Sequence, residues 1–211
     1  ENGGQDRELS ELALDPNTDD RHAVERLADT GVVSAEEMWE GIKTLLQAPA
    51  YPQSPSRLRN LLANLLPILA DELSHVDDPR TPLNRLDRFC DALGTRATLY
   101  SELVENPDFT RRLLTLLRLR ESIVETLIRN PELLDSIVSP TVPEDFSSPL
   151  ETALEKCPPD EDCRDISLRH FKQRETFKIA VQLLSDPWSA ESRKELTSLA
   201  EACIKAAWEW T

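Results

Sequence analysis

Hydrophobic residues recur every three or four positions along most of this chain, and no stretch shows the alternation of a strand. The densest pattern covers residues 86–138, where Leu and Ile fill the repeating positions and charged residues fill the positions between them. This spacing is typical of amphipathic helices that bury one face. We therefore predict an all-α fold, an elongated bundle of about eight to ten helices with no sheet.

Start and stop signals set the expected helix limits. Asn106-Pro107 and Asn130-Pro131 each combine a capping side chain with a proline in the first turn, and residues 120–122 are expected to break the helix between them. Gly94 is expected inside a helix, at a close helix contact, and Pro67 is expected to kink another. The other predicted helices cover about 20–29, 34–49, 56–75, 82–105, 149–156, 160–185 and 190 to the end.

The two Asn-Pro segments also resemble each other, and their spacing would fit a helical repeat, although two copies are too few to establish one. Proline-rich residues 50–55 are the best candidate boundary. We predict an acidic helical N-terminal extension over residues 1–50 and a helical central domain over 51–211. The missing initiator Met, and Trp208 and Trp210 beside the C-terminus, suggest a piece cut from a longer chain.

The charge is strongly negative, −15 over 211 residues, and it is uneven. Residues 1–50 hold 4 Lys and Arg against 12 Asp and Glu, whereas residues 51–130 hold 11 of each. An acidic chain is repelled by nucleic acid and by anionic membranes, so neither is an expected partner. No apolar run is long enough to span a bilayer, and we expect a cytoplasmic protein.

Four cysteines offer limited chemistry. Cys90 and Cys203 lie among apolar helical positions, where a free thiol behaves as a small hydrophobic group. Cys157 and Cys163 flank a short loop. They are expected to be reduced thiols of a cytosolic protein, with a loop-closing disulfide as the alternative.

Other polar groups form no recognisable site. His170 is expected at the surface, and Asp160, Glu161 and Asp162 are interpreted as the acidic first turn of a helix, with a metal-binding acid cluster as the alternative. The basic positions 111, 112, 118, 120 and 129 are interpreted as the wet face of helices, although they could contact an acidic partner. There is no glycine-rich phosphate loop and no Gly-Ser followed by an Asp-x-Asp pair. We predict no catalytic, cofactor-binding or metal-ligating residue in this chain.

Several blocks, in order, resemble one enzyme family. They are SRLRNLLANLLPILADEL, LDRFCDALGTRATLYSELVENPDFTRRLLTLL, LIRNPELLDSIVSP, RHFKQRETFKIAVQLLSD and LTSLAEACIKAA. Together they resemble the central helical region of bacterial glutamine synthetase adenylyltransferase, between its two nucleotidyltransferase domains. The resemblance covers about residues 24–208.

The resemblance implies a bifunctional parent enzyme. One domain would transfer AMP from ATP to glutamine synthetase, and the other would remove it by phosphorolysis, under control of glutamine and the PII signalling protein. ATP and magnesium would bind in the domains that this chain lacks, because neither catalytic motif occurs here. The chain itself is then expected to be inactive.

Two other interpretations stay open. The acidity and the leucine-rich helices would also suit a free-standing helical interaction or scaffold protein. The weaker possibility is an enzyme that uses His170 with the acidic residues at 160–165.

Overall fold

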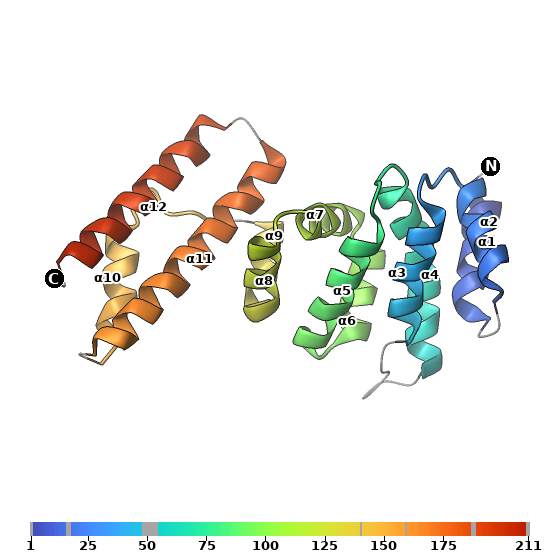
Figure 1. Ribbon diagram of the computed structural model, residues 1–211, viewed down its shortest axis with the longest axis horizontal. Coiled ribbons are helices and arrows are strands. Elements are labelled where there is room, and N and C mark those ends of the chain that lie inside the picture. The colour runs from blue at the N-terminus through green and yellow to red at the C-terminus, as the bar shows by residue number, and fades with distance from the viewer. Residues whose placement is uncertain are drawn as a thin grey trace. The chain divides into compact units, whose positions relative to one another are not determined.

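The computed structural model describes residues 2–15, 18–47, 55–139, 141–158, 160–186 and 189–209. Within these residues the chain forms twelve α-helices and one short 3-10 helix, with no strand (Figure 1). The predicted all-α class is therefore confirmed. In chain order the helices are α1 Asn2–Leu14, α2 Asp20–Asp29, α3 Ala35–Gln47, α4 Pro55–Leu73, α5 Arg80–Leu93, α6 Arg96–Glu105, α7 Pro107–Leu117, α8 Glu121–Arg129, η1 Pro131–Leu133, α9 Leu134–Val138, α10 Ser147–Glu155, α11 Glu161–Ser185 and α12 Ala190–Trp208.

The helices form two compact units, Glu1–Leu119 and Arg120–Thr211. The sequence instead predicted a division between residues 50 and 51. Most of that proline-rich connector lies outside the described residues, but helices from its two sides pack together, α1 on α4 and α3 on α5. The compact units therefore do not divide there, and the separate domain roles assigned to 1–50 and 51–211 remain predictions.

The first unit is organised around α4, which packs on α1 and α6 and buries most of its leucines. Pro67 lies inside α4, and the helix continues through it. A kink at this proline stays a prediction. Helix α2 begins as predicted, because Asp19 accepts a hydrogen bond from the backbone N–H of His22. The buried residues of α4 are Leu58, Leu62, Ala63, Leu65, Leu66, Leu69, Ala70 and Leu73.

The prediction of one helix from 82 to 105, with Gly94 inside it, is wrong. Helix α5 ends at Leu93, and Gly94 adopts a φ of 68°, in the left-handed region. Its backbone N–H bonds back to the carbonyls of Cys90 and Asp91, which is a common way for a helix to end. Helix α6 then begins at Arg96. This break and the full-length α1 bring the number of helices above the predicted eight to ten.

Both Asn-Pro pairs begin helices, as predicted. The side chain of Asn106 accepts a hydrogen bond of 3.2 Å from the Phe109 N–H, and Pro107 is the first residue of α7. Asn130 precedes a single 3-10 turn that leads into α9. The predicted break near residues 120–122 is also confirmed, because α7 ends at Leu117 and α8 starts at Glu121.

The second unit contains a hairpin of the two longest C-terminal helices, α11 and α12, with α10 packed beside them (Figure 1). One cluster of its core consists of Phe146, Leu150, Ile179, Leu199 and Ala202. The Phe146 ring meets the Phe171 ring edge-on, with centroids 6.5 Å apart. Both helices match the predicted limits. Pro187 and Trp188, which lie between the two helices in the sequence, are outside the described residues.

Replacing Gly41 by Ala tests a close contact between α3 and α5. A Cβ at this position of α3 would lie 2.6 Å from Leu83 Cδ1 and 2.8 Å from Leu83 Cβ. An Ala normally stabilises a helix interior by about 1 kcal/mol over Gly. Here we expect Gly41→Ala to lower the free energy of unfolding by about 1–3 kcal/mol, because the added methyl group would overlap the Leu83 side chain. Urea unfolding measures it, and a smaller loss is expected in a Leu83→Ala background. A gain in stability would contradict the close contact.

Candidate functional site

A buried arginine connects α5 to α6 in the first unit. Arg96 is the first residue of α6, and only 5% of its side chain is exposed. Its guanidinium donates to Asp87 Oδ1 at 2.7 Å, to Asp91 Oδ1 at 2.5 Å and to the Asp87 carbonyl at 3.4 Å. Burial lowers the pKa of Arg96, but the hydrogen bonds to Asp91 and Asp87 raise it by more. The arginine therefore stays charged inside the protein.

Cys90 and Tyr100 accompany this ion-pair cluster. Both are fully buried, and burial raises the pKa of the Cys90 thiol to about 12 and the pKa of Tyr100 above its usual value. The thiol is thus protonated and a poor nucleophile at neutral pH. The Tyr100 hydroxyl is a buried polar atom without a hydrogen-bond partner within the described residues. These properties suit a structural core, and they do not suit covalent catalysis.

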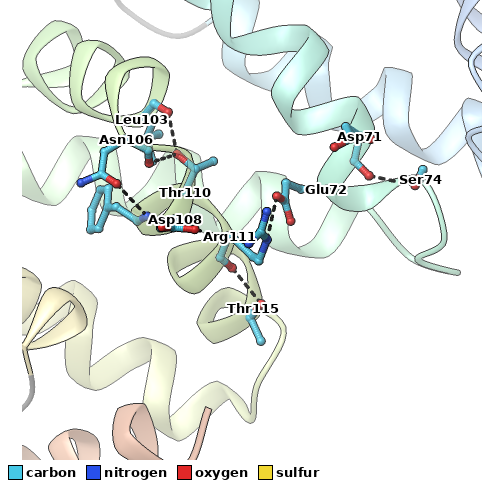
Figure 2. A network of polar contacts seen from close by, with 10 residues as sticks. Asp71, Glu72, Ser74, Leu103, Asn106, Asp108, Thr110, Arg111 and Thr115 are labelled. Atoms are coloured by element: carbon cyan, nitrogen blue, oxygen red, sulfur yellow. Dashed lines mark hydrogen bonds and ion pairs between the residues drawn. The ribbon is translucent and has the colours of Figure 1, made fainter. Parts of the chain in front are cut away.

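A second polar network fixes the elbow between α6 and α7 (Figure 2). Asn106 caps α7, and the fully buried Thr110 donates its hydroxyl to the Leu103 carbonyl at 2.6 Å. The same hydroxyl lies 3.2 Å from the Asn106 carbonyl. These bonds use the carbonyls that the end of α6 leaves without a partner in the helix. The direction of α7 is set by hydrogen bonds made inside the protein.

Arg111 continues this network across to α4 (Figure 2). Its guanidinium lies 3.1 Å from Glu72 and 3.4 Å from Asp108. Arg111 and Glu72 line an open groove of about 500 Å³ beside α1, α4 and α7, together with Asp6, Asp71 and His75. The groove carries acidic and basic groups together, and Arg111 is 61% exposed. The arrangement can hold helices together, but it does not converge on one reacting atom.

The basic positions named from the sequence are divided between the two compact units. Arg111 pairs with α4, whereas Arg129 pairs with Glu125 of its own helix at 3.6 Å. Arg118 directly follows α7 and is exposed, as is Arg120. Arg111, Arg112 and Arg118 belong to the first unit, and Arg120 and Arg129 to the second.

The other candidate residues also remain apart. His170 is exposed on α11, and Asp160 precedes that helix without a side-chain capping bond. Across the described ranges, no group of three or more His, Cys, Asp or Glu residues could hold a metal ion. All four cysteines are free in the structure, and their reduced state in the cell stays a prediction. None of the described helices has the length and apolar character needed to cross a membrane.

Sequence reasoning missed the Arg96 cluster. Its signal is present, since Asp87 and Asp91 are one helical turn apart and a Gly-Thr-Arg turn follows. The assumption of a continuous helix through Gly94 concealed it, because Arg96 can reach back to α5 only if the chain turns there.

Replacing Arg96 by Ala should destabilise the first unit by about 3 kcal/mol, since it leaves the Asp87 carboxylate without its cation in a partly buried place. Arg169→Ala is the matched control, because Arg169 is 71% exposed and its pair with Asp165 lies on the surface of α11. That change should alter the unfolding free energy by less than about 0.5 kcal/mol. Equal effects in chemical unfolding would show that the Arg96 cluster is not buried as described.

Replacing Thr110 by Val should cost about 1–2 kcal/mol, because the buried Leu103 carbonyl loses its donor. Thr115→Val makes the same chemical change on the same helix, where the hydroxyl bonds to the Arg111 carbonyl at 2.8 Å in an exposed position. Its expected cost is below about 0.5 kcal/mol. Thermal unfolding of the two variants measures the difference. A Thr115 effect as large as the Thr110 effect would contradict the role of the elbow.

Comparison with known proteins finds one family model and several curated enzymes that are similar to this all-α chain. The family described as glutamate-ammonia ligase adenylyltransferase matches residues 110–211, from α7 to the end. The bifunctional glutamine synthetase adenylyltransferase/adenylyl-removing enzyme of Chromobacterium violaceum is 29% identical over 94% of this chain and 23% of its own length. The enzymes of the same name from Idiomarina loihiensis and Thioalkalivibrio sulfidiphilus are 30% and 31% identical, over 88% and 74% of this chain.

The chain spans about a fifth of the length of the curated relatives that it matches, 23%, 20% and 17% of these three. The matches extend over both compact units, and the resemblance in the leucine-rich blocks is thereby confirmed. The chain belongs to the glutamate-ammonia ligase adenylyltransferase family.

Proposed function

We propose that this chain is a non-catalytic helical segment of a bifunctional enzyme that adds AMP to glutamine synthetase and removes it. The observation that carries the proposal is the family match over residues 110–211, which falls on helices α7 to α12. Relatives matched over most of this chain are named for both reactions. Because the chain spans only about a fifth of those relatives, the catalytic groups are assigned to the rest of the parent enzyme.

The polar contacts support a role in holding helices in place. Transfer of AMP from ATP requires carboxylates that bind magnesium near the phosphates. The carboxylates Asp87 and Asp91 are instead occupied by Arg96, and Glu72 is occupied by Arg111. Asn106 and Ser189 cap helices. These groups stabilise the joints between helices, which is the property expected of a segment that separates and positions two nucleotidyltransferase domains.

The proposal assigns partners and cofactors to the parent enzyme. Glutamine synthetase would be its protein substrate, PII its regulatory partner, and the cytoplasm its location. ATP and magnesium would bind in the nucleotidyltransferase domains on either side of the segment. Nucleic acid and membranes are not proposed as partners, since the chain carries a net charge of −15.

The first test compares the isolated chain with the full-length parent enzyme. Each is incubated with glutamine synthetase, magnesium and ATP labelled in the α-phosphate, and label on glutamine synthetase is measured. We expect transfer by the parent and none by the 211-residue chain at equal concentration, because the chain lacks a magnesium-binding carboxylate pair in the required motif. Transfer of AMP by the isolated chain would contradict the non-catalytic assignment.

The parent gene separates this proposal from a free-standing scaffold protein. Nucleotidyltransferase motifs encoded on both sides of this segment are the expected result. Stop and start codons directly at its ends, with no catalytic domain on either side, would favour the scaffold. Failure of the full-length parent to label glutamine synthetase would remove the proposed parent activity.

A further inference from the structure

Two half-buried thiols meet beside one serine in the second unit. Cys157 lies just after α10, and its Sγ is 2.8 Å from Ser167 Oγ of α11. The same sulfur lies 3.9 Å from the Cys163 carbonyl, in the first turn of α11. Cys163 and Ser167 are four residues apart, so both face the same side of that helix. The Cys157 thiol is therefore held against the helix turn that carries Cys163.

The ends of the intervening loop are fixed by secondary structure. The Cys157 N–H bonds to the Leu154 carbonyl at 3.0 Å, which extends the end of α10. The Arg164 N–H bonds to the Asp160 carbonyl at 3.1 Å in the first turn of α11, and α10 packs on α11. Two cysteines held near each other in this way meet the first requirement for a disulfide, which is a short separation that the backbone maintains.

The environment of the pair differs from that of the other two cysteines. Cys157 and Cys163 are partly exposed, and a solvent-borne oxidant can reach them. The adjacent Cys157 thiol raises the pKa of Cys163, while the Ser167 hydroxyl opposes this shift. Cys163 is then mainly a neutral thiol, and the Cys157 thiol and the Ser167 hydroxyl share a hydrogen bond in which either can be the donor. Cys90 is fully buried, whereas Cys203 is as partly exposed as the pair but packs against the core cluster of the second unit.

We propose that Cys157 and Cys163 form a redox-active pair, oxidised by a peroxide to an intramolecular disulfide. The Cys157 thiolate attacks the peroxide O–O bond, giving a sulfenic acid and releasing water or an alcohol after protonation. The Cys163 sulfur then attacks the sulfenic sulfur, forms the S–S bond and releases water. Two thiols lose two electrons and two protons, and the peroxide takes up both.

The disulfide would change the joint between α10 and α11. It would tie the residue after α10 covalently to the first turn of α11 and remove the Cys157–Ser167 hydrogen bond. Helix α10, Arg164 of α11 and Lys205 of α12 line one cleft of about 260 Å³. The oxidation state of the pair would thus restrict motion along one edge of this cleft. The inference rests on these contacts and is independent of the proposed enzymatic function.

The test uses the full 211-residue chain and hydrogen peroxide. After oxidation, remaining free thiols are alkylated and the protein is digested with trypsin without reduction. Cleavage after Lys156 and Arg164 releases both cysteines in one peptide, covering residues 157–164. We expect that peptide to lose two hydrogens and both alkylation sites, and dithiothreitol to restore them. Cys203 serves as an internal control that should remain available for alkylation.

Cys163→Ser removes the second thiol and should convert reversible oxidation at Cys157 into sulfinic acid, which dithiothreitol does not reverse. Cys157→Ser should abolish the two-hydrogen loss. Circular dichroism confirms that both variants keep their helices. The proposal is overturned if the oxidised wild-type peptide retains its hydrogens, if Cys157 pairs with Cys203, or if the only disulfide joins two protein molecules.

Discussion

The first unit depends on a charge placed inside it. The Arg96 guanidinium is almost completely buried, and a buried cation is tolerated only when its partners are close and its donors are satisfied. Asp87 and Asp91 meet this condition only if α6 folds back along α5. These ion pairs form only when the chain turns at Gly94 and Thr95, and they therefore stabilise that turn. Replacing such a cluster by apolar residues can be neutral or stabilising, so its value lies in fixing one arrangement of the helices.

Hydrogen bonds at helix ends serve the same purpose elsewhere. A helix leaves several backbone groups without a partner at each end, and buried ends must find partners in side chains or neighbouring turns. Asn106 and Thr110 provide them at the α6–α7 elbow, and Asp20 binds both Trp39 and Lys43 between α2 and α3. Hydrogen bonds from Trp39 and Lys43 lower the pKa of Asp20, which keeps that carboxylate charged. The leucine faces supply most of the burial, and these polar contacts select how the helices join.

The different roles of the leucine faces and the polar contacts explain which features could be predicted from the sequence. Helix type and most helix limits follow from leucine spacing and from local signals such as Asn106-Pro107, because both act within one or two turns. Gly94 was misplaced because the hydrophobic spacing continues on both sides of it, since α5 and α6 bury their faces in the same unit. The Arg96 contacts depend on that turn and could not be seen without it. Likewise, the packing of α1 on α4 joins residues far apart in the sequence, so local signals could not predict it.

The four cysteines carry the same thiol group, but their surroundings give them different reactivity. Cys90 is enclosed beside Arg96 and Tyr100, where burial holds its pKa near 12, and it can act only as packing. Burial also raises the pKa of Cys203, although Lys172 opposes the shift. Cys157 and Cys163 alone combine partial exposure with contact between the helix turns that carry them. In a helical segment proposed to position other domains, a change at a joint between two helices would alter how those domains are held. Cys157 and Cys163 lie at one such joint. The α5–α6 joint is locked by buried charge, whereas the α10–α11 joint can be locked or released by a two-electron reaction.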